Sequence, residues 1–170
     1  MEVQLNIIRK RIIMKSHLIN VALVVLIFIT ACKTAKIPTE KVQDLNKKVE
    51  SKDFTVEVKY ASPSNGGHIN LSYGYDLRIK NDSAYAYLPY YGIAYSAPYN
   101  GDGGIKFEEL MADYTCVKTK KLDGWDIHFK VKSKENSYDI RLNMFENGNT
   151  TISVNSYNRQ SITFYGELKE

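Results

Sequence analysis

From Phe54 to the C-terminus, apolar and polar residues alternate along the chain. An alternation of period two places the apolar side chains on one face of an extended segment, which is typical of antiparallel sheet with one buried face. Turn signals such as Asn65-Gly66-Gly67 and Asn147-Gly148-Asn149 separate the alternating segments. We therefore predict a mainly β fold. It is an antiparallel meander of about eight or nine strands over about 54–168, curled into a sandwich or a barrel-like sheet.

The apolar positions of these segments predict a single shared core. Because their alternation with polar residues is unbroken, we expect them to face one another inside the fold. The predicted core residues are Trp125, Ile127, Phe129, Tyr138, Ile140, Leu142, Ile152, Val154, Ile162 and Phe164.

The turn at Asn147 constrains how its two flanking strands pair. A two-residue Asn147-Gly148 loop would place Met144 and Ile152 on opposite faces of the sheet. A three-residue loop, 147–149, pairs Met144 with Ile152 and Leu142 with Val154. The core pattern therefore demands the longer loop or a bulge.

A short helix precedes the first strand. Val42, Leu45 and Val49 lie at i, i+3 and i+7, which is one helical face, and Thr39 is suited to cap the helix. We predict one short N-terminal helix over about 39–51. With only three large apolar residues in its stripe, the helix is expected to dock on the domain.

The N-terminus predicts export. Leu18–Ile29 is a nearly unbroken apolar run of twelve residues behind a basic stretch, whereas a membrane-spanning helix needs roughly 20. This is the pattern of a signal peptide, over residues 1–31. Met14-Lys15 would also make a suitable start, so the sequence leaves Met1 and Met14 open as the first residue.

The apolar run ends in Ile29-Thr30-Ala31-Cys32, which resembles the lipobox of bacterial lipoproteins. The resemblance implies that Cys32 carries a covalent lipid, and that the protein is held on a membrane by acyl chains, each buried CH₂ adding about 0.8 kcal/mol. Residues 32–38 then form a tether before a single β-rich domain, 39–170. Lys33 follows the cysteine where an inner-membrane protein tends to have aspartate, so we expect the periplasmic face of the outer membrane.

The charge balance argues against a nucleic-acid partner. The chain has 23 basic and 19 acidic residues. Four of the basic ones and one acidic one lie in the signal peptide, which leaves 19 and 18 in the mature chain, a net charge of +1. A nucleic-acid-binding protein normally carries a basic stripe, and this sequence has none.

Tyrosines concentrate between residues 85 and 99. A tyrosine ring has an apolar face and a polar tip, which suits sugars, peptides and protein surfaces. The rings could equally pack on the sheet, since strands favour tyrosine. Irregular loops on a rigid sheet often carry binding residues, and we predict a candidate binding surface at Tyr90, Tyr91, Tyr95 and Tyr99.

Several motifs together suggest a family. Leu88-Pro89-Tyr90-Tyr91-Gly92, Gly103-Gly104-Ile105-Lys106-Phe107 and Asn158-Arg159-Gln160 occur in this order behind the lipobox. Over about 54–168 the chain resembles a Bacteroidota lipoprotein family, the domain of unknown function 4251. One departure is Ile93, where the family often has arginine. The resemblance implies a location and a fold type, and no activity.

Catalytic and metal-binding patterns are weak. The mature chain has two histidines sixty residues apart, without zinc-type spacing, so we predict no metal and no cofactor other than the lipid. Cys116 is expected to be a buried small hydrophobe or a reactive thiol. A hairpin with an even-length loop at Asp123-Gly124 would put Cys116 and His128 on opposite faces, and only a three-residue loop would bring them together as a nucleophilic pair.

We therefore expect no enzymatic activity, with a hydrolase as an improbable exception. The leading hypothesis is an envelope lipoprotein that acts as a binding module for an envelope protein, a glycan or a small ligand. The alternative is a lipocalin-like carrier of a small apolar ligand, which requires an internal cavity of roughly 300 Å³ or more.

Overall fold

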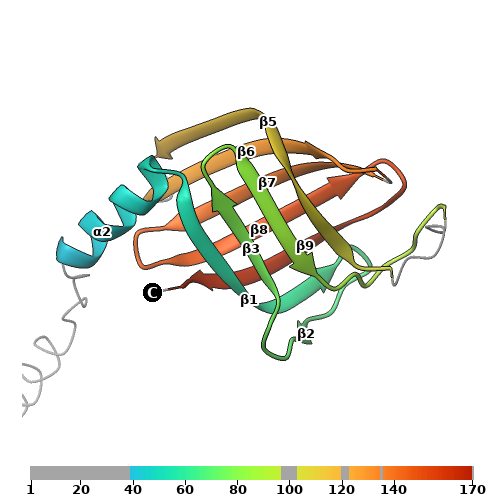
Figure 1. Cartoon of the computed structure of the whole chain (residues 1–170). Helices are drawn as coiled ribbons and strands as arrows, with labels where there is room; N and C mark the ends of the chain where they lie inside the picture. Colours follow the sequence, from blue (N-terminus) through green and yellow to red (C-terminus); the bar gives the residue numbers. More distant parts are fainter. Residues whose placement is uncertain (1–38, 97–102, 120–122, 135, 170) are drawn as a thin grey trace, which may run out of the picture. The chain divides into compact units, whose positions relative to one another are not determined.

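The structure is a computed structural model that describes residues 39–96, 103–119, 123–134 and 136–169. The predicted signal peptide, Cys32 and Tyr99 lie outside these residues. The fold is mainly β, with one short helix, α2 (Thr39–Glu50) (Figure 1). The strands are β1 (Asp53–Pro63), β2 (Ile69–Asn70), β3 (Asp76–Lys80), β4 (Ser83–Leu88), β5 (Ile105–Thr119), β6 (Gly124–Lys132), β7 (Ser137–Phe145), β8 (Asn149–Ser156) and β9 (Arg159–Leu168).

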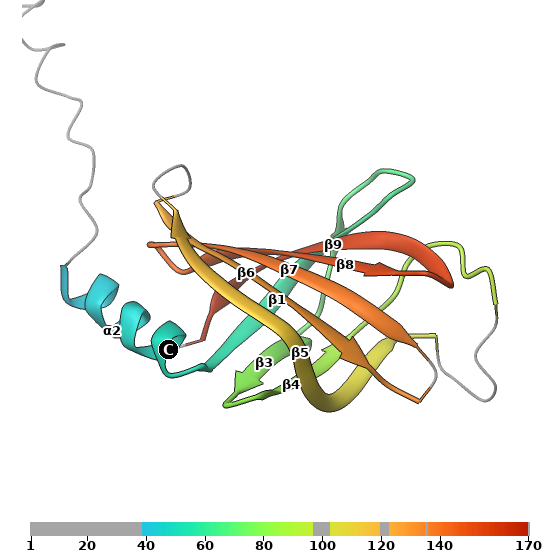
Figure 2. The same cartoon turned by 90° about the horizontal axis from the view of Figure 1, so that it is seen from above.

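Eight of the strands form a closed antiparallel barrel. They pair in the order β1-β3-β4-β5-β6-β7-β8-β9, and β9 pairs back onto β1, so the sheet closes on itself. The short β2 is an extra strand beside the second half of β1. The predicted meander of eight or nine antiparallel strands is confirmed, and its curled form is a barrel. Figures 1 and 2 show the strands from two directions at right angles.

Two long strands turn the corners of the barrel. β5 pairs with β4 over Ile105–Leu110 and with β6 only from Met111 onward. At the changeover β5 is bulged, and Asp113 has a left-handed φ of 53°, a conformation that aspartate tolerates better than most residues. β1 has a similar irregularity between Val58 and Tyr60, while its partner changes from β3 to β2. These bulges let one strand belong to two differently directed parts of the sheet.

The barrel interior is filled by large apolar side chains. All ten predicted core residues are buried, which confirms the interpretation of the alternation. Phe129 and Phe164 are among the fully buried side chains. We call the barrel strands with this shared apolar interior the body. Burial contributes roughly 25 cal/mol per Å² of apolar surface removed from water, and it is the main contribution to the stability of the body.

The helix docks as predicted. Leu45 and Val49 are buried in the core cluster and Val42 is partly buried, so the stripe at i, i+3 and i+7 faces the domain. Lys118 on β5 donates a hydrogen bond to Asn46 at 3.3 Å. Within the described part of the chain, no helix is long and apolar enough to cross a membrane.

The hairpin of β7 and β8 corrects one prediction. Its loop has three residues, as the core pattern demanded, but it spans 146–148, not 147–149. Met144 therefore pairs with Thr150, and Leu142 with Ile152. The shift follows from Gly148, whose φ of 87° supplies the left-handed position of a three-residue hairpin loop. Moving the pairing by two residues keeps every side chain on its predicted face.

Cys116 is exposed, which overturns the expected burial. It lies opposite Ile127 and so shares its face, as predicted. However, β5 has left β4 before this point, so among the described residues β6 is its only paired strand here. Partial burial still raises the pKa of the Cys116 thiol, and the nearby Tyr114 side chain opposes the shift. A raised pKa reduces the reactive thiolate, which argues against a nucleophilic role.

Candidate functional site

One end of the barrel brings together the three motifs that stood apart in the sequence. We call this end the rim: residues 89–96 after β4, the beginning of β5, and the beginning of β9. The rim segment, 89–96, pairs with the beginning of β9 through an isolated bridge between Ala94 and Arg159. Tyr95 N donates to Asn158 O at 2.8 Å, and Gln160 N donates to Ile93 O at 3.0 Å.

Tyr90 holds the rim segment against β9 through hydrogen bonds of its hydroxyl group. Its hydroxyl lies 3.0 Å from both the Ile93 and the Gln160 carbonyl oxygens and is shared between them as a donor. Burial raises the pKa of Tyr90, while the nearby Arg159 guanidinium opposes the shift. Gly92 leaves room for this ring, because a Cβ atom at this position would lie 2.7 Å from the Tyr90 hydroxyl oxygen and would displace it. Tyr90 is thus a structural residue of the rim.

Arg159 is the centre of the rim. It is only 4% exposed, which is unusual for arginine and costs desolvation energy unless the charge is compensated. Its Nη1 donates to Gly103 O at 3.2 Å and to Gly104 O at 3.4 Å. Its guanidinium carbon also lies 4.8 Å from the centre of the Tyr90 ring. One side chain therefore ties β9, the beginning of β5 and the rim segment together.

A second set of polar contacts extends the rim toward the end of β6. Asn158 Nδ2 donates to Asn136 Oδ1, and Asn136 Nδ2 donates to the Tyr138 hydroxyl at 3.2 Å. Ser156 Oγ donates to Asn158 Oδ1 at 2.8 Å. Asn136 and Tyr138 are buried. Their amide and hydroxyl groups are hydrogen-bonded, as polar groups removed from water must be.

Beside this framework lies a small cleft of about 180 Å³, which we call the rim cleft. Tyr75 and Tyr87 stack along one side, with ring centres 5.6 Å apart and planes inclined by 13°. Lys106 Nζ lies 4.6 Å from the centre of the Tyr87 ring, which is a cation–π contact. Tyr91 lines the cleft and is exposed.

The three described tyrosines of the predicted surface have two different placements. Tyr90 is locked by hydrogen bonds, whereas Tyr91 and Tyr95 are exposed, Tyr95 to 67%. Tyr99 lies outside the described residues, as does Cys32. The structure adds Arg159 and Lys106, which sequence reasoning did not select. Both lie in the quoted motifs, but nothing in a motif tells a charged residue that is buried from one that is exposed.

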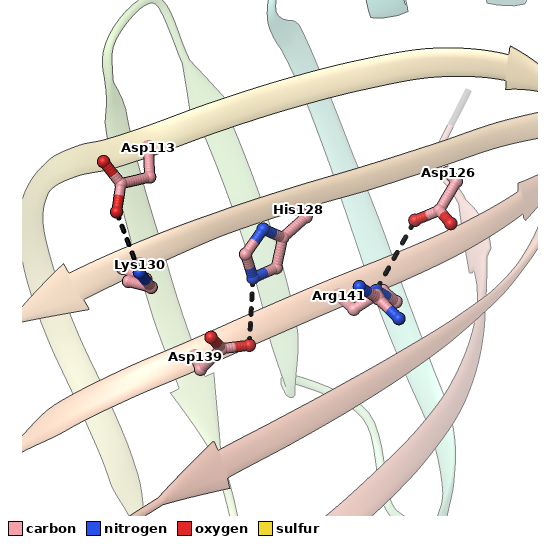
Figure 3. A network of polar contacts seen from close by, with 6 residues as sticks. All are labelled: Asp113, Asp126, His128, Lys130, Asp139 and Arg141. Carbon is pink, nitrogen blue, oxygen red and sulfur yellow. Dashed lines mark hydrogen bonds and ion pairs between the residues drawn. The ribbon is translucent and has the colours of Figure 1, made fainter.

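The outer face of β5, β6 and β7 carries the histidine and its neighbours (Figure 3). His128 Nε2 lies 3.0 Å from Asp139 Oδ1, and Lys130 Nζ lies 2.9 Å from Asp113 Oδ2. Arg141 Nε is 3.7 Å from Asp126 Oδ1. The Lys130 ammonium lowers the pKa of the Asp113 carboxyl. The row is a ladder of cross-strand polar contacts, in which the Lys130–Asp113 and Arg141–Asp126 ion pairs are each worth little at an exposed surface.

This ladder does not bring Cys116 to His128. The residue opposite His128 on β5 is Thr115, while Cys116 lies opposite Ile127 and on the other face. Among the described residues, no group of three histidine, cysteine or acidic side chains could hold a metal ion. What the rim and the outer face offer chemically is stacking and hydrogen bonding.

Comparison with known proteins supplies a family. Residues 38–168 match the sequence profile of a family described as a domain of unknown function (DUF4251). The chain is also similar to a DUF4251 family protein from Bacteroides eggerthii of known crystal structure, with 18% sequence identity and a TM-score of 0.58. That alignment covers 75% of this chain and 86% of the other. At 18% identity the similarity shows that the two proteins share a fold. No curated protein matches the chain.

Proposed function

The chain belongs to the DUF4251 family, and from this premise we propose that it is a non-enzymatic binding module of the cell envelope. In this proposal a lipid on Cys32 anchors it to the outer membrane, on the periplasmic side. The exposed tyrosines of the rim recognise a protein or glycan partner. The support for the anchor is the lipobox-like sequence Ile29-Thr30-Ala31-Cys32 behind a short apolar run.

The observation that carries the binding proposal is the contrast between adjacent tyrosines. Tyr90 is bonded to two carbonyl oxygens, while Tyr91 beside it is exposed and lines the rim cleft. Rings held by a rigid framework lose little conformational entropy on binding, which favours affinity. The buried Arg159 of β9 supplies that rigidity, because it bonds to Gly103 and Gly104 and packs against the Tyr90 ring.

A carrier is the second candidate, because an eight-stranded closed barrel is wide enough to hold one small ligand. The interior of this barrel, however, holds Phe129, Phe164 and other side chains that are fully buried. The rim cleft and two outer grooves, one near the β6–β7 turn and one over β5, β6 and β7, are lined mainly by surface residues. These observations favour recognition at the surface over transport inside.

Site-specific photo-crosslinking in living cells tests the binding proposal. A photoreactive amino acid replaces Tyr91 in one strain and Val117, an exposed residue of β5, in a matched control strain. We expect a discrete adduct from position 91 and none of the same size from position 117. Identical adducts from both positions, or none from position 91, would reject the rim as the recognition site.

Metabolic labelling tests the anchor separately. A clickable palmitate analogue should label the wild-type protein and leave Cys32→Ala unlabelled. Equal labelling of the two proteins would reject the lipid anchor without affecting the argument for the rim.

A further inference from the structure

A second group of aromatic residues lies on the outer face of β1, β8 and β9, outside the rim. It lines a groove of about 350 Å³, which we call the β1–β9 groove. Six of its lining residues matter for the argument: Lys59, Tyr60, Asn149, Thr151, Tyr165 and Glu167.

Two tyrosines form the aromatic part of this groove. Tyr60 and Tyr165 are direct partners across β1 and β9, and residues directly opposite each other in a sheet lie on the same face with their Cβ atoms about 5 Å apart. Their side chains are 45% and 37% exposed, so the core does not use them. The ring of His68 lies 6.0 Å from that of Tyr165 and extends the aromatic surface.

The charges in the groove cancel. Lys59 Nζ lies 2.5 Å from Glu167 Oε2, and this hydrogen bond raises the pKa of Lys59, which keeps the lysine an ammonium. No other charged residue lines the β1–β9 groove as described. By contrast, the groove near the β6–β7 turn is lined by Lys130, Lys132 and Asp139. A neutral occupant suits the β1–β9 groove, because a charged one would meet no unpaired opposite charge.

The polar groups of the groove are suited to hydroxyls. Asn149 and Thr151 provide side-chain donors and acceptors on β8. Lys59 and Glu167 retain donor and acceptor capacity beyond the bond that they share. Flat aromatic faces flanked by hydrogen-bonding groups match a sugar ring, which has apolar C–H faces and hydroxyls at its edge.

We propose that the β1–β9 groove binds a neutral oligosaccharide. Sugar rings stack on Tyr60 and Tyr165, and their hydroxyls bond to Lys59, Glu167 and Asn149. This proposal does not depend on the rim, because the two sites share no residue.

Calorimetric titration of the full-length protein in detergent tests it with defined probes. The neutral probes are cellohexaose, maltohexaose and chitohexaose, and the charged probe is hexagalacturonate. We expect at least one neutral hexasaccharide to bind and hexagalacturonate to bind more weakly. No binding of any neutral probe at millimolar concentration, or tighter binding of hexagalacturonate, would overturn the proposal.

Variants then locate the site. Tyr165→Ala should weaken binding about tenfold, because it removes a stacking face, whereas Tyr165→Phe keeps that face and should stay within about twofold. Tyr157→Ala is the matched control, since Tyr157 is an exposed tyrosine outside the groove. If Tyr165→Ala lowers the melting temperature, the affinity of Tyr60→Ala for the same oligosaccharide tests the groove independently. Full affinity in both alanine variants of the groove would overturn the proposed site.

Discussion

In the body of the barrel, apolar side chains from every strand meet in one interior, whereas at the rim three separate segments meet around a buried arginine. The body is stabilised by burial, which is non-directional and tolerates small shifts of a side chain. The rim is stabilised by hydrogen bonds from Arg159 and Tyr90, which depend on direction and distance. The comparison separates the part of the molecule that makes the fold from the part that can present a binding surface.

The largest expected effect is in the body. Ile140→Ala leaves a cavity among fully packed side chains and should reduce the free energy of unfolding by about 2–5 kcal/mol. Denaturant unfolding measures the loss. Arg141→Ala, the adjacent outward-facing residue, is the control and should change stability by less than about 0.5 kcal/mol. Similar losses in both variants would mean that the faces of β7 are assigned wrongly.

At the rim, Arg159→Met should cost about 1–3 kcal/mol, because it removes charged hydrogen bonds to Gly103 and Gly104. The loss should be local. Hydrogen exchange of the Tyr95 and Gln160 amides, which bond across the rim, should accelerate more than exchange in β7. Uniform acceleration across the barrel would show that Arg159 belongs to the body.

Tyr90→Phe should have a smaller effect, about 0.5–1.5 kcal/mol, because it deletes only the hydroxyl that bonds to Ile93 and Gln160. Tyr91→Phe is the matched control. We expect it to leave the free energy of unfolding unchanged within error. A larger loss from Tyr91→Phe than from Tyr90→Phe would contradict the division between locked and exposed tyrosines.

Alkaline pH should produce the smallest and most gradual effect. Burial raises the pKa of both Tyr114 in the body and Tyr90 at the rim, more strongly for Tyr114. The unfolded chain therefore loses these protons first, near the ordinary tyrosine pKa of about 10. Stability is unaffected by them below that pH and falls above it. Tyr114→Phe should flatten this fall more than Tyr90→Phe, as measured by denaturant unfolding between pH 9 and 11.5.

The sequence predicted the body of the barrel better than it predicted the rim. Period-two alternation predicted the body correctly, including the faces of Ile127 and Leu142, because burial leaves a periodic trace in the sequence. The pairing of Met144 was wrong by two residues, because Gly148 takes the left-handed position of the loop. The exposure of Cys116 was missed because the β5 bulge at Asp113 has no periodic signal.

The rim could be predicted only in outline. Its contacts join residues far apart in the chain, such as Gly104 and Arg159, through single directional hydrogen bonds. The concentration of tyrosines drew attention to the correct segment. It could not separate Tyr90, which is bonded inside, from Tyr91 and Tyr95, which are exposed.

The most direct test of the central claim combines crosslinking with stability. A photoreactive amino acid at position 95 is introduced with and without Tyr91→Ala, and the melting temperature of Tyr91→Ala is measured on the purified protein. The account predicts that Tyr91→Ala abolishes the adduct from position 95 while the melting temperature stays within about one degree, as for other exposed substitutions. An undiminished adduct, or a protein that unfolds when Tyr91 is removed, would contradict it.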